Sequence, residues 1–343
     1  MADETTLPIL AKSKPHRSFR CGLIIGILGF VGLMAFVSTN SKPFLLNKDA
    51  EPIATVHPII GVLSHPIAQD EAIYTNQEYI AASYVKWIES AGGRVVRIPF
   101  TASKEELRRI VMSVNGVLFP GGDPDPNEQA KYLYDLAIEV NRNGTYFPLW
   151  GTCLGFEWLV QLTSNNLKIL DPVDAQDVSS AISYTNEESR LFSFSPSFDA
   201  LTKAPLSAYF HHLGITTEHF LATESLSSFY KATATSLDRN GVEYIAAIEA
   251  KEYPIYGIQF HPEKNPYELG ELANGNVYGT INHSYEAIMA AQAFSHFFIR
   301  EAKKNHHRFP TTDEEIKSIL WNQATTNAMY PALESIYAFD PVN

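Results

Sequence analysis

Hydrophobic residues along the middle of the chain change repeatedly between two spacings, which predicts alternating strands and helices. The run 58–64 is apolar and has the length of a buried strand. Ile80, Tyr84 and Trp87 then recur at helical spacing, and Gly92-Gly93 ends that helix. The same pattern predicts strands at 94–98, 116–119 and 147–151, and helices at 104–114, 128–140 and 154–162.

This order of elements predicts an α/β fold with a doubly wound, mostly parallel central sheet and helices on both faces. The stretch 171–237 is rich in Ser, Thr and Phe, and we expect irregular strands and loops there. The runs 244–248 and 255–259 predict a closing pair of strands. A long amphipathic helix around 287–298 completes the pattern.

The composition is that of a folded, acidic protein. Hydrophobic residues make up 45% and charged residues 19% of the 343 residues, which is typical of a globular chain. The formal net charge is −12. A nucleic-acid partner is therefore not expected, because phosphate binding needs a basic surface.

An uncharged apolar run occupies 21–37 and follows a basic flank. This order is typical of an export signal, and the length suits either a long signal peptide or a short membrane span. A signal-anchor, a cleaved signal peptide and a buried helix of a cytosolic protein all stay open. Export would place the body in a lumen or outside the cell. The sequons at Asn143 and Asn282 would then be glycosylation sites.

Cys153 and Cys21 are the two cysteines of the chain, and Cys21 lies at the edge of the apolar run. A lone cysteine is often a buried small hydrophobe. Cys153, however, is the centre of a G-x-C-x-G motif, Gly151 to Gly155, between a predicted strand and a predicted helix. Glycines allow close chain contacts at such a turn, and the helix N-terminus favours a thiolate. Cys153 is therefore the candidate nucleophile.

A base and an oxyanion site are also present in the pattern. His261 follows the predicted strand 255–259 and would shuttle the proton, while Glu263 would hold one ring nitrogen. The N–H groups of Leu154 and Gly122 are the candidate donors to the oxyanion. Both follow strands of the sheet, where open α/β folds bind ligands.

These motifs resemble the triad glutamine-amidotransferase superfamily and, more narrowly, the γ-glutamyl hydrolases. The resemblance extends from about residue 58 to residue 307, and its specific stretches are 79–85, 150–157, 253–267 and 305–307. It implies a class I glutamine-amidotransferase-like, flavodoxin-like fold. It implies Cys153 as nucleophile and His261 as general acid/base, and roles near the substrate for Tyr84, Glu157 and His211.

The resemblance also implies an activity and a location. The expected enzyme is a cysteine-type omega peptidase that cleaves γ-glutamyl amide bonds of folate and antifolate poly-γ-glutamates through an acyl-enzyme, without cofactor. The protein is expected in the lumen of the lysosome or vacuole, or outside the cell after secretion. Retention as a single-pass type II membrane protein is left open. Membrane contact is expected only through the N-terminal apolar segment, and a homodimer stays open. The segment 171–205 matches the family weakly.

The chain therefore divides into five expected parts. They are a basic leader at 1–20, an apolar segment at 21–38, a linker at 39–57, the catalytic domain at 58–310 and a C-terminal extension packed on it at 311–343.

Two other functions compete with the hydrolase. One is a glutaminase of the amidotransferase type, or a hydrolase of another γ-glutamyl compound. The other is an inactive, membrane-tethered binding protein, which the intact Cys153, His261 and Glu263 disfavour. A metal site is not expected, because adjacent histidines such as His211-His212 and His306-His307 point apart and lack acidic partners at ligand spacing.

Overall fold

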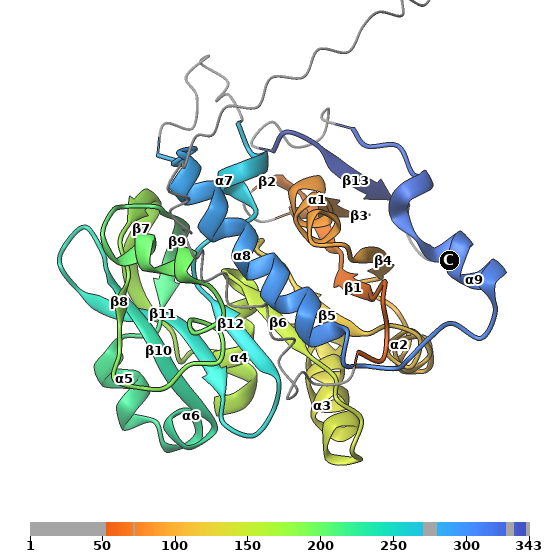
Figure 1. Ribbon diagram of the computed structural model, residues 1–343, viewed down its shortest axis with the longest axis horizontal. Helices are drawn as coiled ribbons and strands as arrows, with labels where there is room; N and C mark the ends of the chain where they lie inside the picture. Colours follow the sequence, from red (N-terminus) through yellow and green to blue (C-terminus); the bar gives the residue numbers. More distant parts are fainter. Residues whose placement is uncertain (1–52, 71–72, 270–279, 327–332, 341–343) are drawn as a thin grey trace, which may run out of the picture. The chain divides into compact units, whose positions relative to one another are not determined.

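The computed structural model describes residues 53–70, 73–269, 280–326 and 333–340 (Figure 1). An eight-stranded sheet runs through them in the order β4-β1-β5-β6-β12-β11-β10-β8. Its parallel part consists of β4 (Arg94–Ile98), β1 (Ile59–Leu63), β5 (Gly116–Phe119), β6 (Leu149–Thr152) and β12 (Ile255–Ile258). Its antiparallel part consists of β11 (Glu243–Ala250), β10 (Tyr230–Leu237) and β8 (Ser183–Tyr184). The predicted mostly parallel sheet is confirmed.

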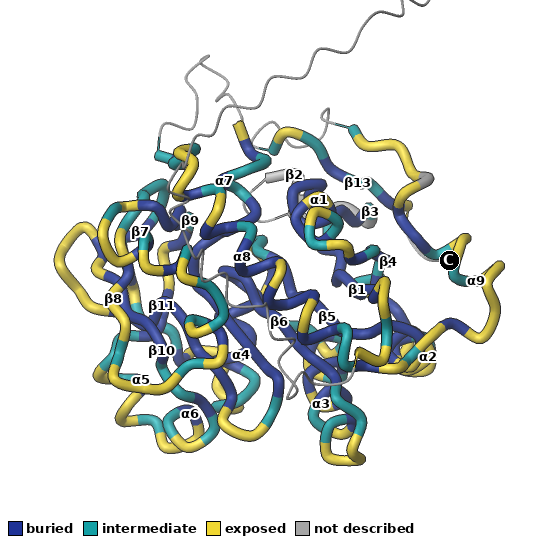
Figure 2. Tube along the Cα trace, in the orientation of Figure 1, coloured by how far each residue is buried: buried dark blue, intermediate teal, exposed yellow. Residues whose placement is uncertain are grey.

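Helices cover both faces of this sheet (Figure 1). On one face lie α1 (Ala82–Ser90) and α8 (Tyr285–Ala302), where Trp87 Nε1 donates to the carbonyl of Ala291 over 2.9 Å. On the other face lie α2 (Lys104–Val111), α3 (Glu128–Arg142) and α4 (Leu154–Ser164). Strands β1, β5, β6 and β12 are buried along their whole length (Figure 2), as expected for parallel strands covered on both sides.

The stretch 171–237 is more regular than the sequence predicted. Its elements are β7 (Asp171–Ser180), η1 (Pro196–Thr202), β9 (Ser207–Gly214), α5 (Thr217–Ala222) and α6 (Glu224–Phe229), besides β8 and β10. β7 and β9 pair antiparallel as a separate two-stranded sheet. The hydrophobic pattern missed β7 because only Val173 and Ala175 of this strand are buried. Its extended form depends on pairing with β9, which a local pattern does not report.

A third sheet joins the two ends of the body. β2 (His65–Asp70), β3 (Ile73–Ala81) and β13 (Ile336–Phe339) lie in the order β13-β3-β2. The N–H of Ala82, where α1 begins, donates to the carbonyl of Ser335 over 2.9 Å. Before β13 come α9 (Thr312–Ser318) and η2 (Leu320–Asn322), and the short α7 (Lys264–Tyr267) follows β12. The C-terminal segment thus reaches the start of α1.

The N-terminal predictions fall outside the described residues. The basic leader, the apolar run 21–37 and Cys21 all lie there. Within the described ranges, no helix has both the length and the apolar character needed to cross a membrane.

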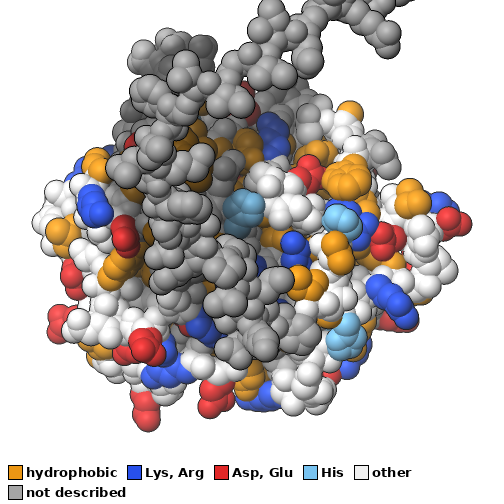
Figure 3. Space-filling model, in the orientation of Figure 1, with side chains coloured by type: hydrophobic (Ala, Val, Ile, Leu, Met, Phe, Trp, Pro, Cys, Tyr) orange, Lys and Arg blue, Asp and Glu red, His pale blue; other side chains and the backbone are white. Residues whose placement is uncertain are grey.

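Acidic and basic side chains are interspersed over the coloured part of the face seen in Figure 3.

Candidate active site

Cys153 occupies the turn between β6 and α4 in a backbone conformation that few side chains adopt. Its φ is 52° and its ψ is −108°, outside the regions that L-residues favour. Its N–H donates to the carbonyl of Ile258 over 2.9 Å, which ties the turn to the end of β12. A strained residue between a parallel strand and a helix is the geometry of a nucleophile elbow.

Gly155 shows why this turn needs glycine. A Cβ at Gly155 would lie 2.0 Å from the carbonyl oxygen of Phe119 in β5, and one at Gly151 would lie 2.5 Å from the carbonyl oxygen of Gly155. Backbone atoms cannot move aside as a flexible side chain can. The two glycines therefore let α4 begin directly against the sheet, and Cys153 is held at the carboxyl ends of the parallel strands.

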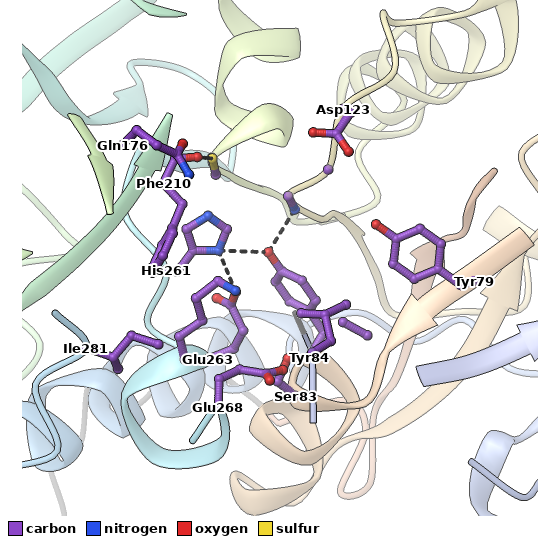
Figure 4. Close-up of a pocket in the computed structure, with 16 residues that line it drawn as sticks. Tyr79, Ser83, Tyr84, Asp123, Gln176, Phe210, His261, Glu263, Glu268 and Ile281 are labelled. Atoms are coloured by element: carbon purple, nitrogen blue, oxygen red, sulfur yellow. Dashed lines mark hydrogen bonds and ion pairs between the residues drawn. The ribbon is translucent and has the colours of Figure 1, made fainter. Parts of the chain in front are cut away.

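His261 and Glu263 form a close, buried pair just after β12. His261 Nδ1 lies 2.6 Å from Glu263 Oε1, and the two residues are 6% and 1% exposed (Figure 4). The contact assigns the proton of a neutral ring to Nδ1, because a carboxylate can only accept. Nε2 then keeps its lone pair and is available as a base.

Gly121 lies where three candidate residues meet. A Cβ there would lie 2.6 Å from His261 Cε1, 3.0 Å from the Tyr84 hydroxyl and 3.5 Å from Cys153 Cβ. The N–H of Gly121 donates to the Tyr84 hydroxyl over 2.7 Å, and this hydroxyl lies 3.5 Å from His261 Nδ1 (Figure 4). Because Gly121 has no side chain, the loop after β5, the elbow and the loop after β12 can come together around it.

These residues line a cavity of about 210 Å³. Cys153 lies in its wall, together with His261, Glu263 and Tyr84. Further lining comes from Gly121, Gly122, Asp123, Gln176, Phe210, Lys264 and Glu268. The cavity opens at the carboxyl ends of the parallel strands, the edge at which open α/β sheets bind ligands.

The oxyanion candidates differ in what their N–H groups do. The N–H of Leu154 bonds to the Cys153 sulfur and thereby lowers the pKa of the thiol. Gly122 lines the cavity, and among the described residues no acceptor takes its N–H. The N–H of Gly121 is engaged as well, by the Tyr84 hydroxyl. The positions of Leu154 and Gly122 are thus compatible with the predicted oxyanion role, which stays a prediction.

The resting thiol differs from the thiolate that the helix N-terminus led us to expect. Burial raises the pKa of Cys153 well above its ordinary value, and a negative charge on Glu157, when that residue is ionised, or on Glu263 raises it further. The Leu154 N–H and the Lys264 charge lower this pKa, but by less. Desolvation of the sulfur outweighs the helix terminus. The predicted nucleophile role of Cys153 therefore requires a base that takes its proton, and His261 is the predicted base.

Glu157 lies behind the nucleophile and does not line the cavity. Its side chain is 7% exposed and accepts from Gln259 Nε2 over 2.9 Å. Burial raises the pKa of Glu157 to about 8, and the bond from Gln259 lowers it only in part. The carboxyl group is therefore protonated below that pH, when it imposes no negative charge on the sulfur. Its predicted contact with substrate stays a prediction.

His211 is buried beside the cavity but is not part of its wall. Its pKa is lowered to about 3, chiefly by burial, so the ring is neutral. Nδ1 donates to the carbonyl of Leu213 over 2.7 Å, and Nε2 has no partner among the described residues. A positive His211 that attracts an anionic substrate does not fit this environment. Any role near the substrate is limited to the Nε2 lone pair and stays a prediction.

Two buried residues near the cavity were missed by sequence reasoning. His65 is 1% exposed, and a Cβ at Gly122 would lie 2.3 Å from His65 Nδ1, so this ring supports the Gly122 turn. Glu268 is 2% exposed and lines the cavity. His65 directly follows the first predicted strand, and that position could have drawn attention to it. No signal of comparable strength marked Glu268.

The glycosylation candidates have different surroundings. Asn143 is exposed at the end of α3. The Asn282 side chain donates to the carbonyl of Pro205 over 3.3 Å and accepts from the N–H of Ser284 over 2.9 Å. Among the described residues, no group of three or more His, Cys, Asp or Glu side chains is arranged to hold a metal ion.

Comparison with known proteins identifies the family. The peptidase C26 model matches residues 58–263, which contain the elbow and the His–Glu pair. This chain belongs to the peptidase C26 family. It is 37% identical to γ-glutamyl hydrolase B of Dictyostelium discoideum over 82% of this chain and 83% of that protein. It is 35% identical to the γ-glutamyl hydrolase of Bos taurus over 92% of this chain and 98% of that protein. It is 37% identical to the γ-glutamyl hydrolase of Homo sapiens over 77% of this chain and 83% of that protein.

Proposed function

We propose that this protein is a cysteine-type γ-glutamyl hydrolase in which Cys153 attacks the γ-carbonyl carbon. The observation that carries the proposal is the strained Cys153 elbow, which shares one cavity with the buried His261–Glu263 pair. Membership of the peptidase C26 family and similarity to γ-glutamyl hydrolases over most of the chain support it.

Acylation begins with proton transfer from the Cys153 thiol to His261 Nε2. The sulfur attacks the γ-carbonyl, and the negative charge that develops on oxygen is met by the N–H groups of Gly122 and Leu154. His261 then gives its proton to the departing amine, because an unprotonated amide nitrogen is a poor leaving group. Glu263 keeps the ring in position and stabilises the imidazolium through the 2.6 Å contact.

Deacylation repeats the sequence with water in place of the thiol. His261 takes a proton from the water, which attacks the thioester carbonyl, and the Cys153 thiol leaves. Glu157 assists both halves below pH about 8, since its protonated form adds no negative charge beside the reacting sulfur.

The proposed substrates are folate poly-γ-glutamates and antifolate polyglutamates. A γ-linked carbonyl lies at the end of a flexible side chain, which can reach into a cavity of about 210 Å³. The backbone of a folded protein cannot reach the bottom of an elbow in the same way. Lys264, in the cavity wall with its Nζ 4.8 Å from the centre of the Phe210 ring, supplies a cation for a substrate carboxylate.

Hydrolysis of a matched pair of substrates tests this function. Purified protein is incubated with pteroyl-tri-γ-glutamate and with the same compound carrying α-linkages, and the products are identified by mass spectrometry. Only the γ-linked compound should be cleaved, with Cys153→Ser as the inactive control. Equal cleavage of both would overturn the substrate, and release of ammonia from glutamine at a higher kcat/KM would favour a glutaminase.

We also propose that the body is lumenal or extracellular. The basic flank before the apolar run 21–37 supports export, and the exposed Asn143 offers a glycosylation site. Alkaline carbonate extraction of membranes from expressing cells separates an anchored form, which stays in the pellet, from a cleaved form. A cytosolic protein without glycan would contradict the proposal.

A further inference from the structure

Gln176 places a carboxamide in the wall of the cavity that contains Cys153. The residue belongs to β7, within the segment 171–205 that matches the family weakly, and its side chain is partly buried. Among the described residues, no side chain or backbone group forms a hydrogen bond with this carboxamide. A carboxamide has two donor hydrogens and an acceptor oxygen. These groups are therefore available to a molecule bound in the cavity.

A β-bulge lies at this point of β7. Gln176 and Asp177 of β7 lie opposite the single residue Phe210 of β9, where the register between the two strands shifts. Asp177 has a φ of 51°, in the left-handed region that residues other than glycine seldom adopt. Bulges next to active sites commonly change the direction of a neighbouring side chain. The irregular strand is thus a feature that positions Gln176.

Arg239 holds the bulge in place. Its Nη2 donates to the carbonyls of Gln176 and Asp177 over 2.6 and 2.8 Å. Its Nη1 donates to Asp174 Oδ1 over 2.7 Å. The Asp177 carboxylate also accepts from the hydroxyl of Thr280. The backbone that carries Gln176 is therefore fixed on both sides, and a donor on a fixed backbone can select a ligand group by its position.

Phe210 connects Gln176 with the reacting groups. The Phe210 carbonyl accepts from Cys153 Sγ over 3.8 Å, and Gln176 lies beside Phe210 at this end of the cavity (Figure 4). The Phe210 ring meets the His261 ring edge-on, with 5.8 Å between the ring centres. Lys264 Nζ lies 4.8 Å from the centre of the same Phe210 ring. Gln176 and Lys264 are therefore both neighbours of the residue that contacts the nucleophile and the base.

The departing glutamate must lie on the His261 side of the cavity, because His261 gives its proton to the departing nitrogen. The α-carboxylate of this glutamate is attached to the carbon that carries that nitrogen. It is therefore the substrate carboxylate with the fewest bonds to the amide that is cut. An N–H donor and a cation on the same side of a cavity complement a carboxylate.

We infer that the Gln176 carboxamide donates to the α-carboxylate of the departing glutamate, with the Lys264 ammonium as the charged partner of the same carboxylate. This inference rests on the proposed function. It makes Gln176 a specificity-determining residue that favours a departing group with an α-carboxylate over an amine without one.

Two substrates that differ only in this carboxylate test the contact. One is pteroyl-di-γ-glutamate, and the other has 4-aminobutyrate, which is glutamate without its α-carboxylate, as the departing group. Full-length protein with Gln176→Met, which keeps the side-chain length and removes the donor, should show a KM roughly 10- to 100-fold above wild type with the first substrate. With the 4-aminobutyrate compound, the KM of variant and wild type should agree within about twofold, because the contact is already absent.

Gln292→Met is the matched control. Gln292 is also partly buried, but it belongs to α8 and does not line the cavity. Its KM should stay within about twofold of wild type with both substrates, since it makes no contact with substrate. An equal rise in the KM of Gln176→Met with both substrates would overturn the inference. So would equal KM values of the wild type for the two substrates, a result that does not depend on how well any variant folds.

A third substrate assigns the carboxylate. Pteroyl-4-aminobutyryl-glutamate keeps the departing glutamate and lacks the α-carboxylate on the acyl side. A persisting effect of Gln176→Met on its KM supports a contact with the departing glutamate. An effect that disappears would place the contact on the acyl side and overturn the assignment.

Equilibrium binding separates this inference from the proposed function. Failure of the wild type to cleave pteroyl-di-γ-glutamate would refute the polyglutamate function. The dissociation constants of the first two compounds, measured by calorimetry on Cys153→Ser, test the contact without turnover. Adding Gln176→Met should weaken binding of pteroyl-di-γ-glutamate and leave that of the 4-aminobutyrate compound unchanged. Equal changes for both compounds would overturn the inference.

Discussion

The buried carboxyl group of Glu157 makes a quantitative prediction about stability and pH. The folded environment raises the pKa of Glu157 from 4.5 to about 8, chiefly through burial. Between these values the native state holds a proton that the unfolded chain has lost. Stability from this group is thus fully present below pH 4.5 and is lost as the pH rises to about 8. Glu157→Gln, which keeps the shape and the oxygen that accepts from Gln259, removes this titration.

The size of the effect follows from the pKa. Each pH unit between the two values lowers the free energy of unfolding by about 1.4 kcal/mol. Over the interval from 4.5 to about 8, the wild type therefore loses on the order of 5 kcal/mol through this residue. The variant should lose none of this contribution. At pH 5 the two proteins should differ by about 1 kcal/mol or less, the usual value of one neutral hydrogen bond.

Urea unfolding at several pH values between 5 and 9 measures this difference. The wild type should become less stable relative to the variant as the pH rises, with the gap levelling off above pH 8. The variant should also keep its kcat at higher pH, because ionised Glu157 raises the pKa of the Cys153 thiol. Parallel stability curves would refute the buried, protonated carboxyl group. A raised KM of the variant at every pH would instead support the predicted contact of Glu157 with substrate.

Four further substitutions test the proposed catalysis and location. Cys153→Ser should fold normally and lose several orders of magnitude in kcat, since the covalent route is removed; activity within about tenfold of wild type would exclude Cys153 as nucleophile. His261→Ala should approach that loss, whereas Glu263→Gln should cost less because an amide oxygen can still accept from Nδ1. Near-normal rates for His261→Ala would place the base elsewhere. In secreting cells, Asn143→Gln should abolish a glycosidase-sensitive mass shift, because Asn143 is exposed whereas Asn282 is engaged through its amide; an unchanged shift would assign the glycan to Asn282.

The chain by itself determined the elements whose cause is local. The apolar runs of β1, β5, β6 and β12 indicate strands covered on both faces, because such strands have no solvent-facing side and therefore no alternating polar residues. The motif around Cys153 also has a local cause, since the turn from β6 to α4 admits only glycine at Gly151 and Gly155. His261 and Glu263 are two residues apart, and their pairing could therefore be predicted from spacing and chemistry.

Only the tertiary structure decided what depends on distant segments. β7 is an extended strand because β9 supplies its hydrogen bonds. β13 pairs with β3, whose Tyr79 and Ala81 line the cavity. The resting form of Cys153 was decided in the same way. A helix terminus can be read from sequence, but the desolvation that raises the pKa of the thiol comes from side chains brought in by other strands. The position of Gln176 is likewise invisible in sequence, because the bulge at Asp177 forms where β7 pairs with β9. The local sequence pattern indicates which residues the chain buries. The protonation state and the hydrogen bonds of a buried side chain depend on the groups that the fold places beside it.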